Sequence, residues 1–210
     1  MFYEPGARDR ALLPHDPFKA IVAPRPIGWI STLDAAGTPN LAPYSFFNAV
    51  ADSPPIVMFS SAGMKDSASH ALGRGEFVWN LATWDLREAM NQSSAVLARG
   101  QSEFAFAGLH SAPSRMVAPP RVAATPVAFE CVVTQTIELT DAASRPIDRH
   151  LVLGQVVGVH LDERFILDDG RVDTAAMRPI ARSGYLDEYS VVDEVFHMAR
   201  PPRPEGSRAS

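Results

Sequence analysis

The fold class is decided by the stretch FECVVTQTIELT, residues 129–140. Alternate positions are apolar through most of its length, whereas the positions between them are mostly charged or hydroxyl-bearing. Successive side chains of a β-strand point to opposite faces, so this pattern predicts a strand with one packed face and one face mostly in water. Residues 151–161 are instead apolar on both faces and include Gly154 and Gly158, which indicates a central strand with close backbone neighbours.

Shorter strands are predicted on both sides of these two. Residues 27–33, a turn at 34–37 and a return segment at 41–47 are typical of a hairpin. Further strands are predicted at 56–59, at 77–81 and in a hairpin at 164–172 that turns on Asp-Asp-Gly.

Helices are few and short. One is predicted over residues 65–72, with Asp66 as its cap and Gly73 in the left-handed conformation that ends a helix. A second is predicted after a cap at Thr83, and residues 101–126 are expected to form a long covering loop with short elements. Because few strands are separated by the crossover helix that parallel pairing needs, we expect a mainly β protein with peripheral helices, built as a closed or split antiparallel barrel.

Composition limits the function classes. The chain has 210 residues, 46% hydrophobic and 20% charged, as in a globular protein, and its 18 prolines disfavour a helical bundle. The net charge of −5 supplies no general attraction to nucleic acid or to anionic membranes, so neither partner is expected. With a single cysteine, Cys131, no signal peptide and no apolar run of membrane-spanning length, we expect a cytoplasmic protein.

The chain is expected to form one domain. Residues 1–19 are predicted to be an irregular N-terminal lead-in, residues 20–198 the domain itself, and residues 199–210 a flexible C-terminal tail. No repeat of fixed period is visible, which excludes solenoids and propellers.

The sequence lacks the common catalytic and metal-binding motifs. It has no glycine-rich dinucleotide fingerprint, no phosphate loop and no paired-histidine zinc helix. His150 and His160 are expected to lie on one strand about 33 Å apart, too far to share a metal, so no metal site is predicted. Cys131 falls on the packed face of its strand and is expected to be inert. No catalytic residue is assigned.

Small polar residues gather where strands are expected to end: Ser45 and Asn48, then Ser60 and Ser61, then Lys65 to Ser67. Lys65 and Ser67 stand at a predicted helix start, where free N–H groups and nearby hydroxyls suit a phosphate. The alternative is a plain capped surface helix, and the local sequence leaves both open. Arg25 lies between two prolines and is either a fixed cation at a site or a salt-bridge partner.

Five aromatic residues have two possible roles. They could line a pocket for a flat aromatic ring, or they could belong to the core, as aromatic residues on strands usually do. They are Trp29, Phe46, Phe47, Trp79 and Trp84.

Several of these motifs occur together in a familiar order. Arg25-Pro26-Ile27, NLAPYSFFN at 40–48, Pro54-Pro55 and Lys65-Asp66-Ser67 follow one another at the spacing of a known family. The chain resembles the flavin reductase-like, FMN-binding split-barrel proteins, in the branch that contains the nitrilotriacetate monooxygenase reductase component and flavoredoxin. The resemblance continues to the C-terminal region and spans roughly residues 18–198.

The resemblance implies an antiparallel Greek-key split β-barrel that forms a homodimer and holds FMN noncovalently near the subunit interface. It assigns the flavin and its ribityl chain to the segment Ala42 to Ser45 and the phosphate to Lys65 and Ser67. Two departures stand out: Ser67 replaces a threonine, and His70 stands where many relatives have asparagine. The full set of cofactor-binding residues implied is Arg25, Ile27, Ala42, Pro43, Tyr44, Ser45, Asn48, Ser60, Ser61, Lys65, Ser67, Asn80, Arg182 and Tyr189.

The activity implied is that of an NAD(P)H:flavin oxidoreductase, with NADH or NADPH as the transient electron donor. Reduced flavin or electrons would pass to a partner monooxygenase or another acceptor. The flavin supplies the chemistry, and backbone N–H groups of residues 41–48 are expected to stabilise the charge of the reduced ring. Two alternatives remain: an electron carrier that keeps its FMN, as flavoredoxin does, or a non-catalytic FMN-binding protein.

Overall fold

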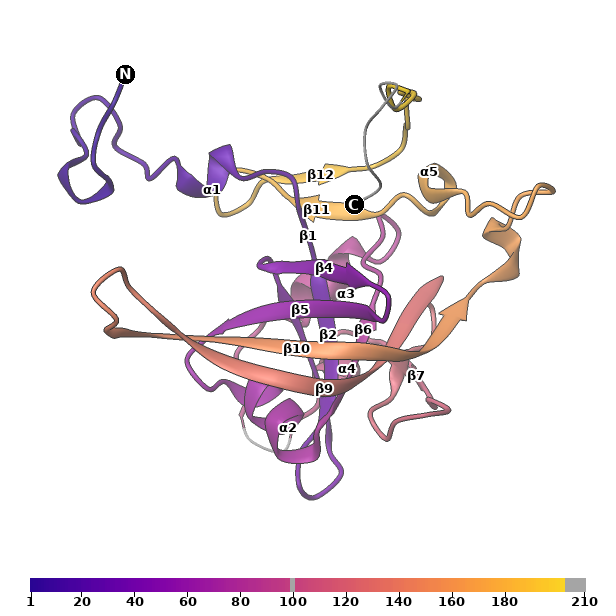
Figure 1. Cartoon of the computed structure of the whole chain (residues 1–210). Coiled ribbons are helices and arrows are strands. Elements are labelled where there is room, and N and C mark those ends of the chain that lie inside the picture. The colour runs from indigo at the N-terminus through magenta and orange to yellow at the C-terminus, as the bar shows by residue number, and fades with distance from the viewer. Residues whose placement is uncertain (99–100, 203–210) are drawn as a thin grey trace.

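The computed structural model describes residues 1–98 and 101–202 and is built mainly from antiparallel β-strands (Figure 1). Seven strands form one sheet in the order β3-β2-β6-β9-β10-β5-β4, and every pairing in it is antiparallel. This confirms the predicted fold class. The strands are β2 (Gly28–Leu33), β3 (Pro39–Tyr44), β4 (Phe47–Asp52), β5 (Pro55–Ala62), β6 (Glu76–Asn80), β9 (Val127–Thr140) and β10 (Pro146–Leu161).

Strands β9 and β10 form a long hairpin in the centre of this sheet. Figure 1 shows the turn of the hairpin extending beyond the other strands, and an ion pair of 2.7 Å between Asp141 and Arg145 closes it. A Cβ on Gly154 would collide with the ring of Phe77, so the close neighbour of this glycine is a side chain and not the backbone that the sequence suggested.

The predicted alternation on β9 is right for Cys131 but wrong for Glu130, which was expected in water and is 0% exposed. The Glu130 carboxylate accepts bonds from the backbone N–H groups of Arg115 (2.8 Å), Met116 (2.5 Å) and Val117 (3.1 Å). His160 Nε2 lies 2.5 Å from its other side. A buried carboxylate is tolerated because each lone-pair direction meets a donor.

Two smaller sheets complete the β structure. One contains β1 (Arg25–Pro26), β11 (Ile180–Arg182) and β12 (Tyr189–Val191), and the other pairs β7 (Ser111–Ala112) with β8 (Arg121–Val122). In Figure 1, β11 and β12 lie near α1, on the β4 side of the barrel. The first small sheet therefore pairs the segment that enters the barrel with strands from the C-terminal part of the chain.

The helices surround the barrel. They are η1 (Pro5–Ala7), α1 (Phe18–Ile21), α2 (Asp66–Arg74), α3 (Arg87–Gln92), α4 (Glu103–Phe106), η2 (Glu163–Phe165) and α5 (Thr174–Met177). Helix α2 connects β5 to β6, which lie on either side of the β9–β10 hairpin, so this connection has the crossing of a Greek key. Its Ala68 and Ala71 are fully buried against core residues that include Phe59 and Phe77.

Three of the five aromatic residues named above belong to the core. Trp29, Phe47 and Trp79 are buried, as is Cys131, whose thiol pKa is raised by burial. This confirms the prediction of an inert, packed cysteine. Phe46 and Trp84 lie outside the two main apolar clusters and line cavities.

Several predicted element boundaries are wrong. Thr83 pairs with Pro179 in an isolated bridge, so its backbone is extended and α3 begins only at Arg87, after Leu86 as N-cap. The return strand ends at Tyr44, and β4 begins separately at Phe47.

The predicted ends of helix α2 also need correction. Lys65 and not Asp66 is the N-cap of α2, and Gly75, with φ of 73°, ends it in place of Gly73. Gly73 can remain helical because the left-handed position comes two residues later.

Two further expectations concern the C-terminal third of the chain. The predicted hairpin at 164–172 is reduced to η2 and a single bridge between Ile166 and Val172. Residues 199–202 of the predicted tail carry no regular element, and residues 203–210 lie outside the described part of the chain.

Within residues 1–98 and 101–202, no helix is long and apolar enough to cross a membrane. The same residues contain no group of three or more His, Cys, Asp or Glu side chains that could hold a metal ion.

Candidate functional site

A cavity of about 560 Å³ lies where the end of β3, the end of β5 and the start of α2 meet. Its walls bring together residues that are separated in the sequence by two strands. Those that the sequence predicted for the site are Ala42, Pro43, Tyr44, Ser45, Ser60, Lys65 and Ser67. The geometry therefore gathers half of the predicted set in one place.

The start of α2 presents hydrogen-bond donors to this cavity. Lys65 is the N-cap and makes no side-chain capping bond, and the first backbone bond of the helix runs from Ser69 N–H to the Lys65 carbonyl (2.9 Å). The N–H groups of residues 66–68 therefore precede the helical ladder and carry the positive end of the helix dipole. Together with the Lys65 amine, they form a set of donors suited to an anion.

A buried polar chain lies behind Ser67. Asn40 donates to the Ser67 hydroxyl (2.8 Å) and to the Thr32 hydroxyl (3.2 Å), and Thr32 lies 3.4 Å from Nδ1 of His70. Tyr44 is the other neighbour of Ser67. Burial raises the pKa of Tyr44, although the hydroxyls of Ser67 and Ser61 act to lower it, so Tyr44 stays protonated and able to donate.

The cavity also has charged residues that the sequence did not predict. Lys19 and Arg149 add two cations to Lys65, whereas Asp66 and Glu103 supply two anions. Glu103 is engaged with the backbone N–H of Leu41 (3.1 Å). Arg149 lies 5.9 Å from the centre of the Phe46 ring, opposite Ala62 in the β10–β5 register. The formal balance of the walls is thus one positive charge.

Asn80 and Ser61 do not reach the cavity. Asn80 is fully buried, donates to the Trp29 carbonyl (3.1 Å) and accepts from Val122 N–H (2.7 Å). Its amide therefore crosslinks strands. Ser61 points to the opposite side of β5 from Ser60 and donates to the Gly63 carbonyl (2.7 Å).

Two more predicted residues lie elsewhere. Ile27 is buried in the apolar cluster with Trp29 and Leu41. Asn48 is exposed on β4 and accepts a bond from the next backbone N–H (2.9 Å). Neither side chain lines the cavity.

Arg25 and Arg182 line a second cavity of about 910 Å³, which shares Lys19 and Ser45 with the first. Arg25 is buried and donates to the carbonyls of Lys19 and Val22 and, at 2.8 Å, to that of Ser183. The alternative of a salt bridge for Arg25 is therefore wrong: its partners are backbone carbonyls. Burial and the nearby charge of Arg182 lower the pKa of Arg25.

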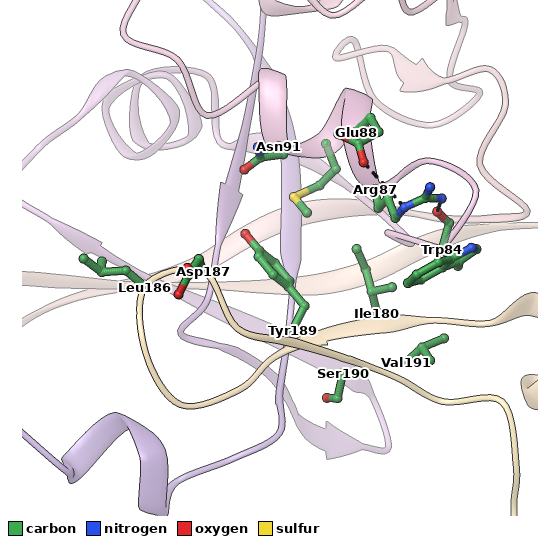
Figure 2. Close-up of a pocket in the computed structure, with 11 residues that line it drawn as sticks. Trp84, Arg87, Glu88, Asn91, Ile180, Leu186, Asp187, Tyr189, Ser190 and Val191 are labelled. Carbon is green, nitrogen blue, oxygen red and sulfur yellow. Dashed lines mark hydrogen bonds and ion pairs between the residues drawn. The ribbon is translucent and has the colours of Figure 1, made fainter.

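Tyr189 accepts a bond of 2.5 Å from Arg182 and lines a third cavity, of about 460 Å³. Figure 2 shows Tyr189 reaching from β12 toward α3, with Trp84 beside Arg87 at the other side of the cavity. The Arg87 guanidinium lies 4.2 Å from the centre of the Trp84 ring. This cavity contains none of the residues at the start of α2.

Among the lining residues that the sequence did not predict, three polar ones differ in the signal that could have found them. Asn40 belongs to the quoted motif at 40–48, so its polarity on a strand with Leu41 and Ala42 was an available signal. Lys19 lay in the lead-in, and Arg149 is placed only by the pairing of β10 with β5. Neither of these two cations carries a local sequence signal.

The donor set fits a flavin mononucleotide. A phosphate needs cations and hydrogen-bond donors, which Lys65, Ser67 and the start of α2 present side by side. A ring and ribityl chain need an apolar wall with a few polar groups, which the segment Ala42 to Phe46 supplies.

Comparison with known proteins agrees with this reading. Residues 22–175 match the family model described as "Flavin reductase like domain". An uncharacterized protein of Deinococcus radiodurans is 36% identical over 192 residues, covering 86% of this chain and 82% of that protein.

Solved structures agree in fold. The chain is similar to nitrilotriacetate monooxygenase component B from Bacillus cereus, with a TM-score of 0.83 and 28% identity over 94% of this chain and 98% of that one. It has the same fold as flavoredoxin of Desulfovibrio vulgaris, with a TM-score of 0.77 and 22% identity over 95% and 97% of the two chains. From its sequence match, its split-barrel fold and its cavity, this chain belongs to the flavin reductase-like domain family.

Proposed function

We propose that this protein binds FMN in the cavity between β3, β5 and α2 and acts as an NAD(P)H-dependent flavin reductase. The observation that carries the proposal is the meeting of Lys65 and Ser67 with the segment Ala42 to Ser45 around one cavity, in a chain of the flavin reductase-like family. Bound FMN would supply the capacity to accept a hydride, which no side chain of the protein has.

The residues at the start of α2 would hold the phosphate. Lys65 contributes an exposed cation, Ser67 a hydroxyl, and residues 66–68 backbone N–H groups. Ser60 lines the same cavity from β5, and Arg149 places a second cation at its wall. Ser61, Asn48 and Asn80 have no part in this proposal, because their side chains bond elsewhere.

The flavin ring would lie along Ala42, Pro43, Tyr44 and Ser45. Ser45 and Lys19 belong to both this cavity and the larger one, so the two cavities adjoin and NADH or NADPH bound in the larger one would lie next to the flavin. Lys19, Arg25 and Arg182 give that second cavity a surplus of cations over Asp16 and Asp187. This surplus suits the anionic pyrophosphate of NADH or NADPH.

We also propose a homodimer that works in the cytoplasm with a redox partner such as a monooxygenase. Apolar side chains are exposed on the β9–β10 hairpin, including Ile137 (42%) and Ile147 (46%). A second copy of the chain would cover them in the dimer. The single cysteine is compatible with a reducing compartment. Sedimentation of the purified protein would give twice the chain mass if the dimer exists and the chain mass if it does not.

The test of the function begins with FMN titrated into purified protein while the flavin fluorescence is followed. Binding is expected to quench the fluorescence, and NADH or NADPH with excess FMN is then expected to be consumed in proportion to enzyme. If quenching occurs and bound FMN is reduced without turnover of free flavin, the protein is an electron carrier. If bound FMN is not reduced by either donor, it is a non-catalytic binding protein. Absence of FMN binding would refute all three.

A further inference from the structure

Asn40 has an unusual position for a polar residue. It lies on β3 with 8% of its surface exposed, and its side-chain amide is directed at two hydroxyls from different elements. One is Ser67 on α2, at 2.8 Å, and the other is Thr32 on β2, at 3.2 Å. An amide nitrogen carries two hydrogens, so these two bonds use both.

The bond from Asn40 decides what the Ser67 hydroxyl can do. A hydroxyl has one hydrogen and accepts through its oxygen. Because the Ser67 oxygen accepts from Asn40, the Ser67 hydrogen is left to donate. Ser67 lines the cavity at the start of α2, where an anion would be its strongest acceptor.

One neutral side chain near Ser67 can also accept this hydrogen. Tyr44 is the other group near Ser67, and it also faces the Ser61 hydroxyl. Ser61 donates its own hydrogen to the Gly63 carbonyl at 2.7 Å, which leaves its oxygen free to accept from Tyr44. With Tyr44 donating to Ser61, and Ser61 to Gly63, the Ser67 hydrogen has two acceptors within reach, the neutral Tyr44 oxygen and an anion in the cavity, and the anion is the stronger of the two.

We infer that Asn40 is a positioning residue that holds Ser67 as a hydrogen donor to the phosphate, and that it thereby makes the site prefer FMN to riboflavin. The inference rests on the proposed function. It goes beyond that function because it assigns the choice between a phosphorylated and an unphosphorylated flavin to a buried amide that would not itself touch the phosphate.

The conservative variant Asn40→Asp reverses the direction of the hydrogen bond between residue 40 and Ser67. The carboxylate is nearly the same shape as the amide but only accepts, so Ser67 would turn its hydrogen inward. The charge would also oppose a phosphate nearby. Asn40→Ala removes the bond without adding charge, and Ser67→Ala removes the hydroxyl itself.

The experiment measures dissociation constants of FMN and of riboflavin, by fluorescence quenching, for the wild type, these three variants and the double variant Asn40→Ala with Ser67→Ala. Asn40→Asp is expected to weaken FMN binding about 10- to 100-fold and riboflavin binding less than about 3-fold. Asn40→Ala is expected to weaken FMN binding about 3- to 10-fold. In the Ser67→Ala background, Asn40→Ala is expected to add little, because Asn40 acts through Ser67.

The matched control is Thr32→Val, which removes the other acceptor of the same amide and keeps the shape of the side chain. It is expected to leave the ratio of FMN to riboflavin affinity unchanged, even if it lowers the melting temperature. Equal losses for both flavins in the Asn40 variants would overturn the inference and make Asn40 a structural residue. Full additivity of Asn40→Ala and Ser67→Ala would overturn it as well.

The two proposals fail in different ways. If the wild type binds neither flavin, the proposed function falls. If the wild type binds FMN but the Asn40 variants keep its preference over riboflavin, only the role of Asn40 falls. Circular dichroism of each variant shows that it is folded before its affinities are compared, and either Asn40 variant is sufficient for the test.

Discussion

The molecule contains two buried polar clusters that differ in what their donors do. At Glu130 the neighbouring donors converge on one acceptor: three backbone N–H groups from residues 115–117 and the His160 ring all end on its carboxylate, and the cluster forms one wall of a cavity of about 570 Å³. At the start of α2, Asn40 bonds to the oxygen of Ser67, and the Ser67 hydroxyl and the Lys65 amine remain as donors that line a cavity. A polar cluster that satisfies itself fixes a loop to a barrel, whereas one with surplus donors can bind a ligand.

The Glu130 cluster should therefore show its importance in stability. Removing the carboxylate with Glu130→Ala leaves the N–H groups of residues 115–117 without their acceptor, one of them the buried N–H of Val117, and we expect the free energy of unfolding to fall by about 3 kcal/mol or more. Urea unfolding measures this loss. Glu138→Ala, on the exposed part of the same strand, is the control and should change stability by less than about 0.5 kcal/mol. Similar losses for both variants would contradict the comparison.

The cluster at α2 should instead show its importance in binding. We expect the double variant Lys65→Ala with Ser67→Ala to weaken FMN binding by about 2 to 4 kcal/mol, because it removes a cation and a hydroxyl from the proposed phosphate site. Isothermal titration with FMN measures the loss. Arg74→Ala, at the other end of the same helix, should leave affinity unchanged. An unaltered affinity in the double variant would move the phosphate to another part of the molecule.

The Glu130 cluster should also give the stability of the protein a dependence on acid. Burial alone would raise the pKa of Glu130, but the hydrogen bonds from residues 115–117 and His160 hold it below its ordinary value of 4.5. A carboxyl with a lowered pKa adds stability above its unfolded-state pKa and loses that contribution as pH falls through the folded-state value. Melting temperature should therefore drop as pH falls below 4.5, and Glu130→Gln should flatten that drop. An identical acid dependence in Glu130→Gln would show that other carboxyl groups control it.

The smallest expected effect concerns the rim of the α2 cavity. Arg149 is partly exposed, so solvent and salt screen its charge. We expect Arg149→Gln to weaken FMN binding by about 0.5 to 1 kcal/mol at low salt and by less at high salt. Titrations at two ionic strengths test this. A loss that does not change with salt would mean that Arg149 makes a direct, desolvated contact.

The sequence predicts local features well and distant ones poorly. Ala42 to Ser45 and Lys65 to Ser67 are contiguous motifs, and the structure brings them to one cavity. Asn80 illustrates the limit: a polar residue at a strand end looks like a ligand until Trp29 and Val122 are found to use its amide.

Burial of a polar side chain is hard to predict for the same reason. Glu130 alternates with the packed Cys131 along β9, but the loop at 115–117 and His160 on β10 cover it. That loop is joined to β9 by contacts that no sequence period encodes. The pairing of β10 with β5, which places Arg149 at the cavity, is equally invisible in a local pattern.

The guanidinium of Arg25 connects the N-terminal segment of the protein to its C-terminal part. It donates hydrogen bonds to the carbonyls of Lys19 and Val22 and also to that of Ser183, which lies 158 positions after Arg25 in the sequence. Those segments also form the walls of the second cavity. A truncation that removes residues 19–22 would therefore take away two acceptors of Arg25 and part of a wall that Arg182 and Gly184 also build.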